Sequence, residues 1–140
     1  MSLLFDASSI LQLISKSDEK DALRLLNGNH ILDLTKYEVG NALWKEQLLH
    51  RAIGAEELRE FLQLFQSLAC HIKSLSIDIE HLSRVAELAV GEKLTFYDAS
   101  YIAASKIHKL TLVTEDRNLA RSASRHVKTT QVKDLRASNK

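Results

Sequence analysis

Four carboxylates lie where a short apolar run ends or where helical periodicity begins: Asp6, Glu38, Asp98 and Asp116. In a parallel sheet such positions meet at one edge, because the carboxyl ends of the strands lie side by side. Converging carboxylates repel one another, which raises their pKa values unless a cation lies among them. Mg²⁺ or Mn²⁺ suits such a site, since both prefer carboxylate and water oxygens and often bind phosphate as well. The predicted chemistry is activation of water for attack on a phosphodiester.

Each of these acids also has a purely structural interpretation. Asp6 precedes a predicted helix and would serve as its N-cap, and Asp116 would favour the positive end of the next helix. Glu38 and Asp98 each lie three residues after a threonine, which is the spacing of a capping box. Spacing alone leaves both interpretations open for all four residues.

Other chemistries have less support in the sequence. There is no glycine-rich phosphate loop and no nucleophile elbow, and the six histidines show no paired ligand spacing. The single cysteine, Cys70, excludes an internal disulfide, and its context "SLACHIK" predicts a small buried apolar residue.

The elements that must position the acids alternate between strand and helix. Short apolar runs predict strands at 3–6, 30–34 and 110–114, with weaker candidates at 70–75 and 126–130. Helical periodicity fills the intervals, at 8–15, 18–26, 36–52, 55–67, 78–91, 96–108 and 116–124. Strands separated by helices pair in parallel through helical crossovers, so the expected fold class is an α/β sandwich.

Composition places the chain among ordinary globular proteins. Its 140 residues are 45% hydrophobic and 26% charged, which suits a single domain with a real core. No apolar run has the length of a membrane span, and "MSLLFDASS" lacks the features of a signal peptide, so a cytoplasmic location is expected. The net charge of +1 conceals an asymmetry, because residues 1–100 sum to −5 and residues 101–140 to +6. A basic face for a polyanion is compatible with this division.

The chain resembles the PIN-domain family, and within it the VapC-type toxin ribonucleases of prokaryotic toxin–antitoxin pairs. The segments that carry the resemblance are "LLFDASSIL", "LDLTKYEVGNALWKE", "LTFYDASYIAASK" and "LTLVTEDRNLA". The resemblance runs over about residues 3 to 130 and implies a three-layer α/β/α sandwich with a central parallel sheet. We therefore expect a PIN-like nuclease domain at 1–130 and a C-terminal tail at 131–140.

The resemblance also implies roles for individual residues. The acidic quartet that coordinates Mg²⁺ or Mn²⁺ in that family is matched by Asp6, Glu38, Asp98 and Asp116. Thr114 matches a small hydroxyl position that supports a ligand or a bound water. Glu115 is an extra acid, either a surface residue or an alternative ligand. Many relatives have an acid where this chain has Asn118, which leaves the occupancy of a second metal position open.

Basic residues near the acids suggest where RNA would bind. On the helix after Asp116, a four-residue spacing predicts a ridge, or alternatively a solvated helix end, formed by Arg117, Arg121 and Arg125. Lys45 lies seven residues after Glu38, on the same helical face, and is a candidate phosphate contact. Trp44 is expected to serve in core or dimer packing rather than as a base-stacking platform.

The sequence therefore predicts a metal-dependent endoribonuclease that acts as the toxin of a type II toxin–antitoxin pair. The resemblance implies an RNA substrate, a homodimer and a cognate antitoxin whose tail occupies the acidic site. Two alternatives are a PIN-domain nuclease of housekeeping RNA processing and a non-catalytic RNA-binding protein with the same fold.

Overall fold

A five-stranded parallel sheet forms the centre of the computed structural model, which describes residues 2–138. The strand order is β3-β2-β1-β4-β5, and every pairing is parallel. The strands are β1 (Leu3–Phe5), β2 (His30–Leu32), β3 (Lys73–Leu75), β4 (Thr111–Val113) and β5 (Thr129–Thr130). All five predicted strands are therefore present, including the two weaker candidates, which are the edge strands.

Helices connect the strands at close to the predicted positions. Their bounds are α1 (Ala7–Lys16), α2 (Glu19–Leu26), α3 (Thr35–Leu48), α4 (Ala55–Ala69), α5 (Leu82–Glu92), α6 (Phe96–His108), α7 (Arg117–Ala123) and α8 (Val132–Ser138). The helix predicted at 78–91 is divided, because a short 3-10 turn, η1 (Ile79–His81), precedes α5. The predicted helix 36–52 ends earlier than expected, at Leu48.

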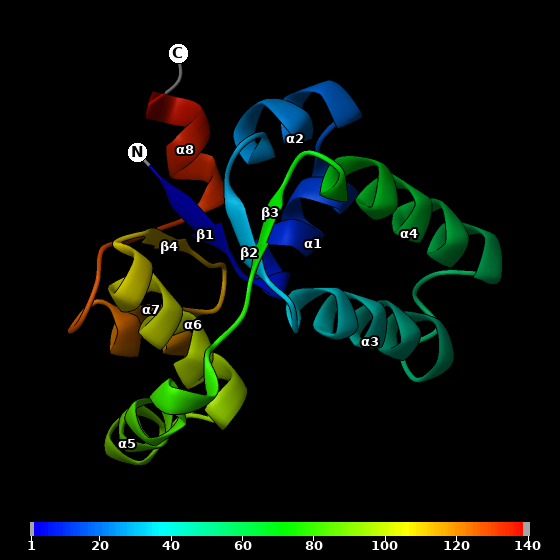
Figure 1. Ribbon diagram of the computed structural model, residues 1–140. Coiled ribbons are helices and arrows are strands. Elements are labelled where there is room, and N and C mark those ends of the chain that lie inside the picture. The colour runs from blue at the N-terminus through cyan, green and yellow to red at the C-terminus, as the bar shows by residue number, and fades with distance from the viewer. Residues whose placement is uncertain (1, 139–140) are drawn as a thin grey trace.

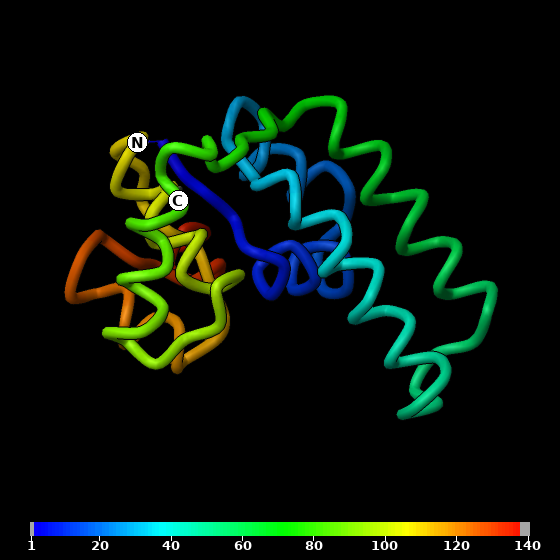
Figure 2. Tube along the Cα trace, turned by 60° about the horizontal axis from the view of Figure 1, so that its bottom comes forward, coloured from blue at the N-terminus to red at the C-terminus, as the bar shows by residue number. Residues whose placement is uncertain are grey.

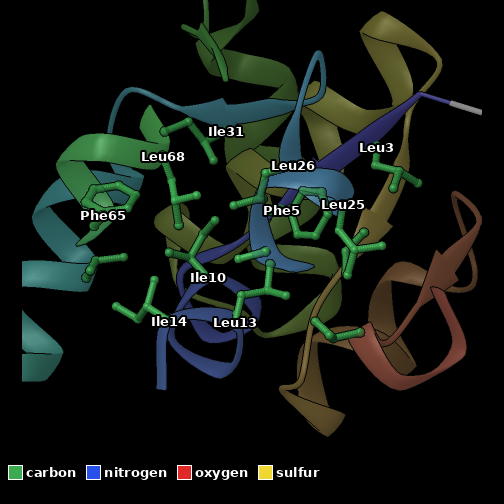
Figure 3. Packing of buried hydrophobic residues seen from close by; sticks show 14 of the residues in the cluster. Leu3, Phe5, Ile10, Leu13, Ile14, Leu25, Leu26, Ile31, Phe65 and Leu68 are labelled. Carbon is green, nitrogen blue, oxygen red and sulfur yellow. The ribbon is translucent and has the colours of Figure 1, made fainter. Parts of the chain in front are cut away.

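Side chains alternate between the two faces of the sheet, and each face is covered by a separate layer of helices. Leu3 and Phe5 of β1 pack into one core with residues of α1, α2, α3, α4 and α8 (Figure 3). Leu4, between them, packs into a second core with residues of α6 and α7. The helices thus lie on both sides of the sheet (Figure 1), and the predicted three-layer sandwich is confirmed.

Helices α3 and α4 form an antiparallel pair that extends away from the sheet (Figure 2). Their inner faces carry the apolar residues Val39, Leu43, Phe65 and Leu68. The outer face of α3 is left exposed, and it carries Tyr37 and Trp44.

Two local expectations differ from the structure. Most of the predicted tail at 131–140 is helix α8, where Val132 and Leu135 are buried against α1; residues 139 and 140 lie outside the described residues. Cys70 is exposed rather than buried, because it ends α4 just beyond the buried residues Phe65 and Leu68. Within residues 2–138, no helix combines the length and the apolar character needed to span a membrane.

Candidate active site

The four predicted acids meet at the carboxyl edge of the sheet, between α3 and α6. Asp6 directly follows β1, and Asp116 follows β4 as the N-cap of α7. Glu38 and Asp98 lie in the first turns of α3 and α6. All four line one cleft of about 280 Å³, together with Ala7, Ser8, Asn41, Ala42, Lys45 and Tyr101.

Asp6 is almost fully buried, and three donors hold its carboxylate. Ser8 Oγ donates to Oδ1 at 2.7 Å, and the backbone N–H of Ser9 donates to the same oxygen at 2.9 Å. Thr114 Oγ1 donates to Oδ2 at 2.5 Å. The bond from Ser9 makes Asp6 the N-cap of α1, as one interpretation of the sequence predicted. Asp6 therefore caps a helix and lines the cleft at once.

The two hydroxyls that bind Asp6 are themselves oriented by the backbone after β4. The N–H of Glu115 donates to Ser8 Oγ at 2.9 Å, and the N–H of Asp116 donates to Thr114 Oγ1 at 3.1 Å. Each hydroxyl accepts one of these bonds, so its own proton is directed to the carboxylate of Asp6. Asp6 and Asp116 are thereby fixed relative to each other, although they are far apart in the sequence.

Glu38 is held by a chain of hydroxyl groups. Tyr101 donates to Glu38 Oε1 at 2.6 Å, and Thr35 Oγ1 lies 2.7 Å from the Tyr101 hydroxyl. Because the single proton of Tyr101 goes to Glu38, Thr35 must donate to Tyr101, and it accepts from the N–H of Leu32 at 3.1 Å. The predicted capping box of Thr35 and Glu38 is wrong, since α3 has Leu34 as its N-cap with no side-chain cap bond.

Asp98 differs from the other acids because no described residue donates a hydrogen bond to its carboxylate. Thr95 is the N-cap of α6, and its Oγ1 accepts from the backbone N–H of Asp98 at 3.1 Å. This bond occupies the main chain of Asp98 and leaves its half-buried side chain available to the cleft. Asp116 is more exposed, and its Oδ1 accepts from the N–H groups of Asn118 and Leu119.

Burial and mutual repulsion act on the carboxylates in the same direction. Burial raises the pKa of Asp6, although the hydrogen bonds from Thr114 and its neighbours offset part of this effect. Burial also raises the pKa of Glu38, and the negative charges of Asp98 and Asp6 add to the increase. The pKa of Asp98 is raised by burial and then by the charges of Asp116 and Asp6. The acids are thus close enough to interact electrostatically.

This arrangement fits a divalent cation. All four candidate ligands are carboxylates, and positive charge would relieve their mutual repulsion. No described residue donates a hydrogen bond to the side chain of Asp98. A second group of possible ligands in the described part of the chain is Asp78, Glu80 and His81, whose ligand atoms all lie within 4.8 Å of one another. The two acids of that group are exposed, and we give it no role.

A larger depression, of about 590 Å³, lies beside α2 and is a poorer candidate. Its acids already have structural partners. Asp18 caps α2 through the N–H of Asp21, and Asp21 pairs with Arg24 and Arg136. The cleft at the carboxyl edge is therefore the better candidate site, despite its smaller volume.

Comparison with known proteins identifies the family. The pattern of the PIN domain matches residues 3–124. The chain belongs to the PIN-domain family. Two similar curated proteins come from Pyrobaculum aerophilum. "Exonuclease VapC9" is 39% identical over 83% of this chain and 81% of its own length, and "Ribonuclease VapC3" is 33% identical over 86% and 93%.

Solved structures support the same fold. The crystal structure of PAE2754 from Pyrobaculum aerophilum has a TM-score of 0.81 and 31% identity, and the match covers 100% of this chain and 97% of that one. A toxin–antitoxin complex from Klebsiella pneumoniae has a TM-score of 0.61 and 22% identity, covering 85% and 91%. At that lower identity, the likeness concerns the fold alone.

The remaining residues predicted for the site of this PIN domain have different positions. Lys45 lines the cleft with the acids, whereas Glu115 does not, because its carboxylate accepts from the N–H of Val132 at the start of α8. The predicted ridge is incomplete. Arg117 and Arg121 are exposed on α7, but the helix ends before Arg125, which instead pairs with Glu92 at the end of α5.

Sequence reasoning missed Ser8 and Tyr101 in the PIN-domain cleft. Ser8 lies two residues after Asp6 and donates to it, and Tyr101 lies three residues after Asp98, on a neighbouring part of the α6 surface. The segment "DASY" held a usable signal for Tyr101, since residues three apart on a helix lie on one side. Its partner Glu38, on another helix, could not be identified from that spacing.

Proposed function

We propose that this PIN-domain chain is a metal-dependent endoribonuclease and the toxin of a type II toxin–antitoxin pair. The observation that carries the proposal is the meeting of Asp6, Glu38, Asp98 and Asp116 in one cleft, where burial and then neighbouring carboxylates raise the pKa values of Glu38 and Asp98. The proposal is supported by the nuclease names of the two curated relatives, which share the family.

In this proposal the four acids hold Mg²⁺ or Mn²⁺. The chemistry that such an ion supplies is activation of water as a nucleophile and stabilisation of the departing oxygen. Asp6 is the rigid ligand, because three donors fix its orientation. Asp98 is the ligand with the fewest competing partners. Thr114 and Tyr101 position Asp6 and Glu38, respectively.

The reaction is hydrolysis of a phosphodiester bond. The oxygen of water bonds to phosphorus, and the bond from phosphorus to the 3′ oxygen breaks, leaving a 5′-phosphate and a 3′-hydroxyl. Lys45 and Asn41 line the cleft beside the acids, where a cationic ammonium and a neutral amide can bind phosphate oxygens. Among its lining residues the cleft has no histidine, so acid–base catalysis by an imidazole pair is not available there.

Internal cleavage is the proposed mode, although one relative is named an exonuclease and the other a ribonuclease. A circular RNA distinguishes the two modes, because it has no end from which an exonuclease can start. Endonucleolytic activity predicts linear products from the circle in the presence of Mg²⁺ or Mn²⁺. A circle that stays intact while the linear form is degraded would assign the chain to exonucleases.

The proposed antitoxin has a suitable surface next to the cleft. An apolar groove of about 340 Å³ lies between α1, α3 and α4 and is lined by Leu11, Ile14, Ser15, Ala42, Leu43, Glu46, Ile53 and Phe61. Ala42 also lines the acidic cleft, so the groove and the cleft adjoin. An amphipathic helix bound in the groove could extend a basic side chain to the acids.

A homodimer is proposed from the exposed outer face of α3. Tyr37, Trp44 and Leu48 are 72%, 46% and 58% exposed and lie on one stripe of the helix, at intervals of seven and four residues. Exposed apolar stripes of this kind favour association with another protein surface. A twofold-related copy would bury the same stripe on both chains.

The experiment that tests the proposed activity is incubation of the purified chain with a pool of cellular RNAs. We expect cleavage with Mg²⁺ or Mn²⁺, loss of cleavage in chelator, and recovery when the ion is restored. Full activity in chelator, or no cleavage with any divalent ion, would contradict the proposal. A small antitoxin reading frame beside the gene separates a toxin from a housekeeping nuclease. The cytoplasmic location stays a prediction from the sequence.

A further inference from the structure

A basic hollow lies at the amino-terminal edge of the sheet, away from the acidic cleft. It has a volume of about 440 Å³, and its lining includes Lys106, Lys109, Lys128 and His126. Ser2 and Thr111, at the beginnings of β1 and β4, mark its place at the edge where these strands begin. The acids of the candidate active site lie where the same strands end, so the two sites are on opposite edges.

The lysines of the hollow come from separate parts of the fold. Lys106 lies in the last turn of α6, and Lys109 ends that helix with a left-handed backbone, at φ 55°. Lys128 lies just before β5. A left-handed position favours glycine, so Lys109 occupies a place where a residue without a side chain would fit more easily.

The three lysines of the hollow have no ion-pair partner within the described part of the chain, although Lys106 and His126 also line an adjoining hollow with Glu87 and Glu92. No acid is among its lining residues, and no described residue forms an ion pair with Lys106, Lys109 or Lys128. The neighbouring acid Glu92 already pairs with Arg125 and with His126. These bonds lower the pKa of Glu92 to about 2, so Glu92 is ionised at neutral pH and pairs with Arg125 and His126.

Helix α6 joins the hollow to the acidic cleft. Asp98 lies in its first turn and Lys106 in its last, and its 13 residues span about 20 Å at the helical rise. Residues 99–105 of α6 are buried, so a long single RNA strand bound in the cleft would reach the lysines over the elements that cover this helix. Concave positive surfaces that follow a phosphate backbone are the usual means of binding single strands without regard to sequence.

We propose that this hollow binds the backbone phosphates of the RNA substrate at a distance from the scissile bond. The inference rests on the proposed ribonuclease function, and it adds a second contact that the acidic cleft does not provide. Its effect is on substrate binding, because the lysines do not reach the reacting atoms.

The test is a triple substitution that removes the three charges without reversing them: Lys106→Gln, Lys109→Gln and Lys128→Gln. A matched control removes three exposed lysines from α1, α2 and β3, with the same change in net charge: Lys16→Gln, Lys20→Gln and Lys73→Gln. Binding to a long single-stranded RNA is measured in chelator, over a range of salt concentrations. Cleavage of the same RNA is then measured with Mg²⁺ or Mn²⁺.

Loss of three phosphate contacts should reduce the salt slope of binding by about two, at roughly 0.7 for each contact on a single strand. The affinity should fall at least tenfold at low salt, and KM should rise with kcat unchanged. The control variant should keep the slope and the KM of the unaltered protein.

An unchanged slope in the triple variant, or an equal loss in the control, would overturn the inference. The inference would also be overturned if the triple variant melts at a lower temperature but binds RNA like the unaltered protein, since the lysines would then only stabilise α6. Binding of the triple variant to vesicles of anionic lipid is measured as well. If the variant loses vesicle binding but keeps the salt slope of RNA binding, the hollow binds a membrane surface and the inference is overturned. Failure of the proposed function gives a different result, namely no cleavage of RNA by the unaltered protein.

Discussion

The hydroxyl of Tyr101 donates a 2.6 Å hydrogen bond to Glu38 Oε1 and so links α6 to α3 across the cleft. Burial and the adjacent carboxylate raise the pKa of Tyr101, so the phenol keeps its proton at neutral pH. The same hydroxyl accepts from Thr35. The orientation of Glu38 is therefore set by a residue that sequence reasoning did not select.

Replacing Tyr101 with phenylalanine removes this bond and retains the ring. We expect the free energy of unfolding to fall by about 1–3 kcal/mol, because Thr35 and Glu38 lose a buried partner. Metal affinity or activity should fall by about 10- to 100-fold, as is typical when the group that orients a ligand is removed. Calorimetric titration of Mn²⁺ and initial rates of cleavage measure these effects.

Tyr97→Phe is the matched control, since Tyr97 is on the same helix and 63% exposed. It loses the same hydroxyl without touching Glu38, so metal affinity and rate should stay unchanged. If both variants change metal affinity and cleavage rate equally, Tyr101 does not position Glu38.

The raised carboxylate pKa values predict how stability depends on pH in the absence of metal. The folded state holds the protons of Asp6, Glu38 and Asp98 to higher pH than the unfolded state does. Stability should therefore decrease as the pH rises from the ordinary carboxyl range, near 4, through the raised values. Thermal melts in chelator should show this decrease, and Asp98→Asn should make it smaller. A stability that increases with pH across the same range would contradict the proposed electrostatics.

The main parts of the fold were predictable because their signals are local. Short apolar runs in the sequence identified β1, β2 and β4. Parallel pairing of β1 with β4 then brought Asp6 and Asp116 to one edge of the sheet. The contact between Tyr101 and Glu38 was not predictable, since it joins residues 63 positions apart through the tertiary packing of two helices.

Two predictions from the sequence differ from the structure because they depend on where a helix begins or ends. The four-residue spacing placed Arg125 on the ridge with Arg117 and Arg121, but α7 ends at Ala123 and frees Arg125 to reach Glu92. Residues 131–140 were expected to form a tail because the family resemblance ends at about residue 130. Val132 and Leu135, three residues apart, are enough to bury one side of a short helix.

Arg121 and Arg125 should therefore differ in RNA binding. Arg121→Gln should weaken binding to single-stranded RNA and reduce the salt slope by roughly 0.7, because Arg121 is exposed on α7 without a described ion-pair partner. Arg125→Gln should leave the slope unchanged and lower the melting temperature, because it removes the pair with Glu92. Filter binding over a salt series compares the two. If the two variants have equal salt slopes of RNA binding, Arg121 is a solvated surface residue that does not contact phosphate.

Association through α3 is tested by the double variant Trp44→Ser, Leu48→Ser. We expect a dimer for the unaltered chain and a monomer for the variant, since both side chains lie on the exposed stripe of α3. Light scattering after size exclusion gives the mass. Val90→Ser removes an 80% exposed apolar residue from α5 and should leave the dimer intact. A monomeric unaltered chain would exclude the proposed homodimer.

The central claim is that these acids catalyse hydrolysis by water, and the chemical ends of the RNA products test it most directly. Cleavage by water leaves 5′-phosphate and 3′-hydroxyl ends, and the ribose 2′-hydroxyl takes no part. Asp98→Asn keeps the backbone bond to Thr95 and hence the fold, but it should abolish cleavage by removing a ligand charge. The predicted result is products with 5′-phosphate and 3′-hydroxyl ends, and no cleavage in chelator or with Asp98→Asn. Ends carrying 2′,3′-cyclic phosphate, or full activity in either condition, would contradict the account.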